Sequence, residues 1–171
     1  HAQTLLKSLG ALDDDGRITT AGRRLAALPC HPRIARMLDS ASTPQLRALG
    51  CDIAALLEEK DPLNDEADAD ITTRIALLRQ YRRSRCTGRW QRIADIASQY
   101  RRLIECEADN ASFNPCAAGR LVALAFPERV AMATTDGRYR LASGEYVGLN
   151  EADPLAGNPL LAVASTGSRI Y

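Results

Sequence analysis

Residues 9–33 have the sequence LGALDDDGRITTAGRRLAALPCHPR, and this stretch decides the fold of the first part of the chain. Its centre is Asp15-Gly16, a dipeptide typical of a tight turn because glycine adopts a positive φ without steric cost. Around the start of this stretch, the spacing of four leucines predicts an amphipathic helix: Leu5, Leu6, Leu9 and Leu12.

A second helix is predicted after the turn. Thr19 or Thr20 can accept the hydrogen bond that caps a helix start, and Pro29 cannot continue the helix. Between turn and helix there is room only for a short strand. Helix, tight turn, short strand and helix in this order outline a small winged-helix element at residues 1–32, and we expect Gly16 and Gly22 to set its geometry.

The composition is that of a helical globular protein. Of the 171 residues, 46% are hydrophobic and 25% charged, which are ordinary values for a globular domain. Aromatic residues make up only 5%, so aliphatic residues must form most of the core, and alanine and leucine favour helices. Because no run of about 18 apolar residues and no signal peptide are present, we expect no membrane contact and a cytoplasmic location.

The five cysteines do not form a metal-binding pattern. They are widely spaced, odd in number and without a Cys-x-x-Cys pair: Cys30, Cys51, Cys86, Cys106 and Cys116. The chain has only two histidines that could assist them. We therefore expect neither a zinc site nor a disulfide framework, but reduced thiols of a cytosolic protein.

Residues 33–127 are predicted to form a helical bundle. Its centre is a helix at residues 46–59, in which residues 51–57 are apolar apart from Asp52, so most of its faces are expected to be buried. Two arginine-bearing helices follow, separated by Thr87-Gly88. Asn114-Pro115 opens a last helix, which Pro127 stops.

After residue 128, four short segments separated by turn residues are expected to form strands: residues 129–133, 138–142, 145–149 and 160–164. Asp136-Gly137 between two of them is a hairpin signal. We expect a small, incomplete antiparallel β unit at residues 128–171, and the missing initial methionine and the apolar end suggest a piece of a longer protein. The predicted fold class is mainly α, with a winged-helix element, a helical bundle and this β unit.

Two neighbouring segments of the chain carry opposite charge. Residues 52–70 hold eight acidic residues and one lysine, a net charge of −7. Residues 71–106 hold nine arginines and two acidic residues, a net charge of +7. This pattern indicates either that the two segments pack against each other or that the surface is polarised.

Arginines at the junction of the two basic helices are the candidate binding residues. A helical hairpin would gather six of them near its tip: Arg79, Arg82, Arg83, Arg85, Arg89 and Arg92. Guanidinium groups placed in this way can contact phosphates without reading a base sequence. The alternative is a set of ordinary surface arginines that the acidic segment neutralises.

No catalytic pattern stands out. The chain lacks a G-x-x-x-x-G-K-[ST] phosphate loop, a G-x-S-x-G elbow and a plausible Ser/His/Asp set. We expect His31, beside Cys30, to be a capping or interface residue. Glu58, Glu59 and Asp61 oppose the dipole at a helix C-terminus, and we expect them to form a solvated face or salt links with the neighbouring arginines rather than an acid/base site.

Four motifs carry a family resemblance. Residues 9–38 resemble the winged-helix and helicase-associated region that follows the two RecA-like motor domains of DEAH-box ATP-dependent helicases. Three later motifs resemble the bacterial HrpB branch of that family: IAALLEEKDPL at 53–63, GRLVALAFPERVA at 119–131 and GRYRLASG at 137–144. The order and spacing of the motifs match that branch over essentially the whole chain.

This resemblance implies an accessory region of an ATP-dependent RNA or nucleic-acid helicase. The winged helix would pack on the motor domains, and the bundle, a ratchet-like domain, would help to form the single-strand channel. ATP and Mg²⁺ would bind the motor domains of the parent protein, whereas this chain would contain no cofactor site, no metal site and no catalytic residue. The parent protein would be a nucleoside-triphosphate hydrolase, and ATPase activity of this chain by itself is not expected.

The partners implied are the RecA-like motor domains and single-stranded nucleic acid, with RNA favoured over DNA. The arginines expected to face the strand are Arg82, Arg83, Arg85, Arg89 and Arg92. The alternative function is a protein-interaction or scaffolding module without direct nucleic-acid contact. A free-standing winged-helix transcription factor is disfavoured, because its second helix offers only Arg23 and Arg24 for base readout.

Overall fold

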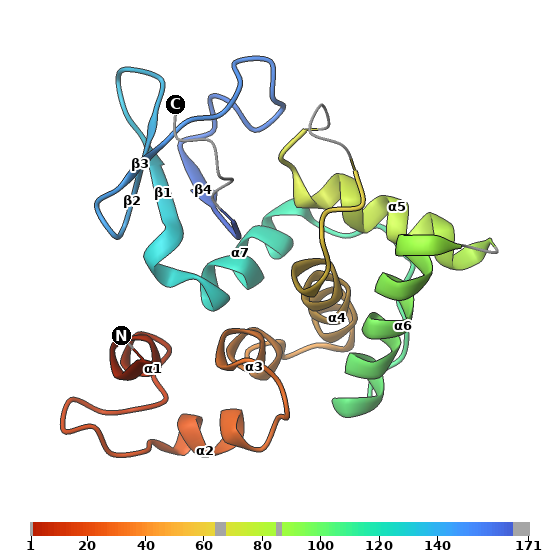
Figure 1. The fold of residues 1–171 in the computed structure, drawn as a ribbon, viewed down its shortest axis with the longest axis horizontal. Helices are drawn as coiled ribbons and strands as arrows, with labels where there is room; N and C mark the ends of the chain where they lie inside the picture. The colour runs from red at the N-terminus through yellow and green to blue at the C-terminus, as the bar shows by residue number, and fades with distance from the viewer. Residues whose placement is uncertain (1, 64–67, 85–86, 166–171) are drawn as a thin grey trace.

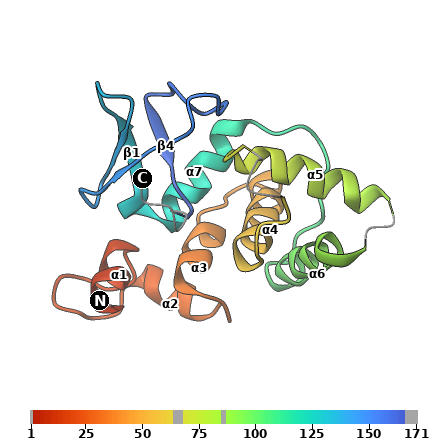
Figure 2. The same ribbon diagram turned by 45° about the horizontal axis from the view of Figure 1, so that its top comes forward.

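The computed structural model describes residues 2–63, 68–84 and 87–165. Within these ranges the chain forms seven α-helices, one 3₁₀ turn and a four-stranded antiparallel sheet. The fold class predicted from the sequence is therefore confirmed. The winged-helix element and the sheet lie on one side of the molecule and the helical bundle lies on the other (Figures 1 and 2).

The first part of the chain has the predicted order of helix, turn, short strand pairing and helix. It consists of α1 (Ala2–Ser8), an isolated antiparallel bridge between Leu12 and Ile18, and α2 (Thr20–Ala26). The Thr19 hydroxyl accepts a hydrogen bond of 2.9 Å from the Gly22 N–H and so caps α2. Gly16 has a φ of +80° in the turn, which explains why glycine stands there.

Helix α3 (Pro32–Asp39) connects the winged-helix element to the bundle. Pro32 occupies its first turn, and Nδ1 of His31 accepts a hydrogen bond of 3.2 Å from the Arg33 N–H. His31 is thus a capping residue, as expected from the sequence. One face of α3 contributes Ala35 to the small core of the winged-helix element, and other faces contribute to the main core.

Helix α4 (Pro44–Glu58) is the centre of the bundle. It contacts α3, α5 (Ile71–Arg83), α6 (Gly88–Leu103) and α7 (Pro115–Ala125), which enclose it (Figure 1). Side chains cap the starts of three of these helices, where Thr43, Asp70 and Asn114 accept backbone N–H groups. All nine residues at positions 48–56 of α4 are buried, Asp52 among them.

The sheet follows α7 and a 3₁₀ turn, η1 (Pro127–Arg129). Its strands are β1 (Val130–Ala133), β2 (Tyr139–Leu141), β3 (Tyr146–Val147) and β4 (Leu160–Ala162), in the order β3-β2-β1-β4. The predicted Asp136-Gly137 hairpin turn joins β1 and β2, with a φ of +77° at Gly137. One face of the sheet buries Ala131, Tyr139 and Leu141.

A junction around Arg33 ties α3 to the start of the sheet. Its Nη1 donates to the Ala125 carbonyl at 2.8 Å, and its Nη2 lies 2.6 Å from a Glu128 carboxylate oxygen. Arg33 and Arg129 both lie over the Phe126 ring, each 4.8 Å from its centroid. Burial is the largest single influence on Glu128 and would raise its pKa, but the hydrogen bond from Arg33, a backbone hydrogen bond and the charges of Arg33 and Arg129 together lower that pKa.

Arg33 lies at the first predicted domain boundary and Glu128 at the second, so the two boundaries meet in space. The division into residues 1–32, 33–127 and 128–171 stays a prediction. Among the described helices, none is long and apolar enough to cross a membrane.

Candidate nucleic-acid interface

The candidate interface is the end of the α5–α6 hairpin, where the sequence predicts a cluster of arginines. The last turn of α5 and the first turn of α6 meet at the right-hand edge of the bundle (Figure 1). Gly88 opens α6 with a φ of +65°, a conformation that other residues rarely adopt. The last turn of α5 and the first turn of α6 bring basic residues from both helices to one end of the bundle (Figure 1).

Asp52 of α4 organises a buried part of this region. Its carboxylate is fully buried, accepts a hydrogen bond from Arg82 Nη2, and lies 3.1 Å from Arg79 Nε and 3.6 Å from Arg101 Nη1. A buried carboxylate is costly unless it is paired. One acidic side chain of α4 thus holds three guanidinium groups from α5 and α6.

The loop between α6 and α7 completes the cluster. Arg79 Nη1 donates to the Ala111 carbonyl at 2.6 Å and its guanidinium lies over the Phe113 ring, while Arg82 Nη1 donates to Asn110 Oδ1 at 3.1 Å. Burial, together with the nearby Arg82 charge, lowers the pKa of Arg101. Since the Arg82 side chain is only 13% exposed, the structure places this predicted strand-facing residue in the Asp52 cluster instead.

Other acidic residues of the negative segment also pair with the positive one. Arg74 binds Asp61 at 2.8 Å and Asp68 at 3.1 Å, and Arg92 lies 3.6 Å from Glu59. These contacts favour mutual packing of the two segments. Asp65 and Glu66 lie outside the described residues.

Three of the five predicted arginines are exposed: Arg83, Arg89 and Arg92. Arg83 and Arg89 donate to backbone carbonyls, of Asn110 at 2.8 Å and of Asp61 at 2.9 Å. Neither has a carboxylate partner within the described part of the chain, so their charges stay uncompensated there. The Arg92 side chain is 70% exposed despite its contact with Glu59. Arg85 lies outside the described residues.

An aromatic pair lies at the same end of the hairpin. The rings of Tyr81 in α5 and Trp90 in α6 are stacked, with centroids 5.0 Å apart and planes at 25°. Tyr81 is 37% exposed, whereas Trp90 packs against the main core. The sequence analysis does not identify this pair, because nothing in either helix alone shows that the two rings meet.

Sequence reasoning also missed the Asp52 cluster, although one signal for it was available. An acidic residue in the middle of an otherwise apolar helix must find a cationic partner when the helix is buried. Asp52 therefore predicts buried arginines. The partners are far from Asp52 along the chain: Arg79 follows it by 27 residues and Arg101 by 49. The sequence alone therefore does not show which arginines they are.

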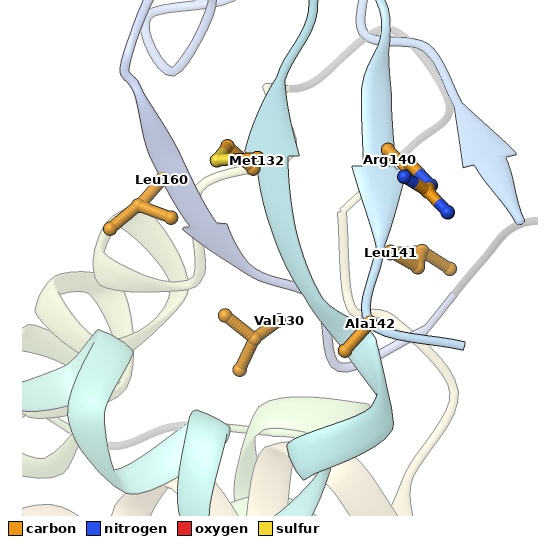
Figure 3. Close-up of a pocket in the computed structure, with 6 residues that line it drawn as sticks. All are labelled: Val130, Met132, Arg140, Leu141, Ala142 and Leu160. Atoms are coloured by element: carbon orange, nitrogen blue, oxygen red, sulfur yellow. The ribbon is translucent and has the colours of Figure 1, made fainter. Parts of the chain in front are cut away.

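A second surface lies on the open face of the sheet. Met132 and Leu160 are 60% and 62% exposed and lie on neighbouring strands, beside an open cavity of about 330 Å³ (Figure 3). Arg140 lies at the same cavity on β2. This face is apolar with one cationic side chain, in contrast to the arginine-rich hairpin.

The thiols of Cys51 and Cys106 lie side by side. Cys51 Sγ and Cys106 Sγ lie 3.9 Å apart, and burial raises the pKa of both thiols, which disfavours the reactive thiolate. Among the residues that the structure describes, no three His, Cys, Asp or Glu side chains come close enough to hold a metal ion.

Comparisons with known proteins agree with this architecture. Residues 2–30 match the model of the helicase associated domain (HA2), winged-helix family. The chain is 33% identical over 156 residues to the ATP-dependent RNA helicase HrpB of Escherichia coli (strain K12), an alignment that covers 91% of this chain and 17% of that protein.

Solved structures give the same result. The crystal structure of the E. coli DExH-box NTPase HrpB has a TM-score of 0.71 and 31% identity, and covers 94% of this chain and 18% of that one. The crystal structure of the Escherichia coli DEAH/RHA helicase HrpB has a TM-score of 0.71 and 30% identity. That alignment covers 93% of this chain and 18% of the chain in the crystal structure. The chain thus spans less than a fifth of the length of these relatives. In sequence and in fold, it corresponds to the helicase-associated region of an HrpB-type DEAH-box helicase.

Proposed function

We propose that this chain is an accessory region of an ATP-dependent RNA helicase that packs on the motor domains and forms part of the path of the single strand. The observation that carries the proposal is the group of exposed arginines at the end of the α5–α6 hairpin, in a chain that corresponds to an HrpB helicase region. Arg83, Arg89 and Arg92 would contact phosphates, with Arg85 between them in sequence.

Arg82 has a different role in this proposal. Its guanidinium is held by Asp52 and Asn110, so it positions the last turn of α5 rather than contacting the strand. ATP and Mg²⁺ would be bound by motor domains of the parent protein, which would act in the cytoplasm.

The test is the affinity of the chain for a labelled oligouridylate at low ionic strength. The charge-reversed variant R83E/R89E/R92E is expected to bind at least tenfold more weakly than the wild type, because phosphate contacts dominate such affinity. R23E/R120E/R140E is the matched control, since it changes the same charge at exposed arginines elsewhere. Equal weakening by the two variants would contradict a specific interface.

The second candidate function is a docking module without nucleic-acid contact. The exposed Met132 and Leu160 on the open sheet face favour it, because contiguous apolar surface often marks a protein-binding site. In the same assay, no binding of the strand by the wild type at low salt would leave docking as the function.

A further inference from the structure

We propose that the exposed face of Tyr81, supported from behind by Trp90, is a stacking platform for one base of the single strand. The inference rests on the proposed function and adds a second kind of contact to the phosphate contacts of the arginines. It assigns to the end of the α5–α6 hairpin a site that recognises the aromatic character of any nucleobase.

The geometry of the pair leaves one ring face available. Trp90 covers one side of Tyr81 in a stack with 5.0 Å between centroids and 25° between planes. Tyr81 is nevertheless 37% exposed, and we infer that the exposed part includes the ring face away from Trp90. A base placed on that side would extend the two-ring stack to three rings in the offset arrangement that aromatic groups prefer.

The platform is also held in place before a ligand arrives. Trp90 packs against the main core of the bundle, and Tyr81 lies in the last turns of α5, which the Asp52 cluster fixes through Arg79 and Arg82. A ring that is already immobilised loses little conformational freedom when it binds a ligand. An exposed but rigid aromatic ring is therefore suited to binding rather than to packing alone.

Charge at the same end of the hairpin suits a polyanion. Arg83 follows Tyr81 by two residues and Arg89 precedes Trp90, and neither has a carboxylate partner among the described residues. Proteins bind single strands without sequence preference by combining two features. Aromatic rings stack on the bases, and a basic surface contacts the phosphate backbone. The two features coincide here on one helical hairpin.

Among the described residues, a second exposed aromatic ring also lies beside an arginine, but it does not offer this combination. Tyr146 on β3 is 52% exposed and lies under Arg138. However, residues 128–165 contain five acidic residues and three arginines, so this part of the chain has a net negative charge that disfavours phosphates. Residues 71–103, by contrast, contain nine arginines and one acidic residue.

Trp90 provides a local probe, because it is the single tryptophan of the chain. We would titrate the 171-residue chain with an oligouridylate of about 12 nucleotides, a length within known site sizes, and with an abasic strand of the same length and charge. Binding would be followed both by the anisotropy of a label on the strand and by tryptophan fluorescence.

The expected result is that the base-containing strand quenches Trp90 and binds at least about fivefold more tightly than the abasic strand. Y81F keeps the ring and should behave like the wild type. Y81A should lose the preference for bases while it still binds the abasic strand with wild-type affinity. Y81L, which keeps the apolar volume over Trp90, should lose the preference as well, and its thermal unfolding shows whether the hairpin is intact.

Two other results would overturn the proposal in distinguishable ways. Equal affinities for both strands, with no change of tryptophan fluorescence, would refute the stacking platform and leave phosphate binding by the arginines in place. Failure of the wild type to bind either strand at low salt would refute the proposed function and this inference together.

Discussion

Asp52 is the residue on which the interior of the bundle depends most. Its fully buried carboxylate faces Arg79, Arg82 and Arg101. The contacts satisfy the carboxylate, yet Arg82 Nε and Arg101 Nη1 are buried without a hydrogen-bond acceptor. The cluster therefore contains more positive than negative charge. The single carboxylate offsets part of the repulsion among the three guanidinium groups.

We expect D52N to lower the free energy of unfolding by about 3–5 kcal/mol, because it keeps the side-chain volume but leaves three guanidinium groups without a counter-charge. Urea denaturation followed by circular dichroism measures the loss. D15N is the control, since the Asp15 side chain is 71% exposed, and it should stay within about 0.5 kcal/mol of the wild type. A loss below about 1 kcal/mol for D52N would contradict the role of the cluster.

Gly22 is required by a close approach of two segments. A Cβ atom there would lie 2.1 Å from the Ala11 carbonyl oxygen and 2.9 Å from Ile18 Cγ1. We expect G22A to destabilise the chain by about 1–3 kcal/mol, because backbone must move to relieve the clash.

Gly119 in α7 gives the matched substitution, since no atom lies within 4 Å of a Cβ built there. G119A should raise the free energy of unfolding by about 0.5–1 kcal/mol, because alanine is the better helix former. Chemical denaturation of the two variants side by side checks both signs. If G22A and G119A changed the free energy of unfolding in the same direction, packing around Gly22 would not be the cause of the G22A effect.

At the residue scale, the sequence predicts what depends on local chemistry. The N-cap at Thr19, the turn glycine Gly16 and the capping role of His31 are all confirmed, because each involves neighbours within a few residues. The partners of Asp52 could not be identified in this way. They are set by how α4, α5 and α6 pack.

The β1–β2 hairpin turn contains an acidic residue with a shifted pKa. Hydrogen bonds from Thr134 and Arg138 lower the pKa of Asp136 from 3.8 to about 2. A carboxyl group whose pKa is lower in the folded state stabilises that state above its unfolded pKa. The contribution of Asp136 is therefore complete above about pH 4 and is lost as the pH falls towards about 2.

An NMR titration of the Asp136 carboxyl carbon measures this directly and should give a midpoint near pH 2. T134V removes the hydroxyl donor and should move the midpoint upward. E145Q changes an exposed acidic residue beyond the other end of β2, and it should leave the Asp136 midpoint unchanged. A wild-type midpoint close to 3.8 would show that the turn does not form as described.

At the element scale, the helices and strands follow from periodicity and turn signals. The central helix was expected at residues 46–59 and extends over Pro44–Glu58, and all four expected β segments contain a strand. The strands are shorter than the apolar segments that predicted them. Their ends are set by which partner strand lies alongside, and only the fold determines that.

The candidate interface shows the same division between local and non-local information. The sequence places the arginines near one helical junction, and Arg83, Arg89 and Arg92 are indeed exposed there. The face of α5 that carries Arg79 and Arg82 turns towards Asp52 instead. Helical spacing does not distinguish these two faces when arginines occupy both.

At the scale of the whole molecule, the described residues form three hydrophobic cores that meet around Arg33. A small core lies in the winged-helix element, the main core lies around α4 and a third lies under the sheet. Arg33 connects the first two to the sheet through Glu128 and Phe126. The winged-helix element thus packs against the bundle through α3, whereas Arg83 and Arg89, which have no carboxylate partner among the described residues, lie at the far end of the bundle.

The most direct test of this account is the salt dependence of single-strand binding. For single strands, the logarithm of the affinity falls with the logarithm of the salt concentration by about 0.7 for each phosphate that is neutralised. R83Q/R89Q/R92Q should therefore reduce the magnitude of the slope by about 2, whereas R23Q/R120Q/R140Q should leave it unchanged. A slope in R83Q/R89Q/R92Q equal to that of the wild type would contradict the assignment of the α5–α6 hairpin as the nucleic-acid interface.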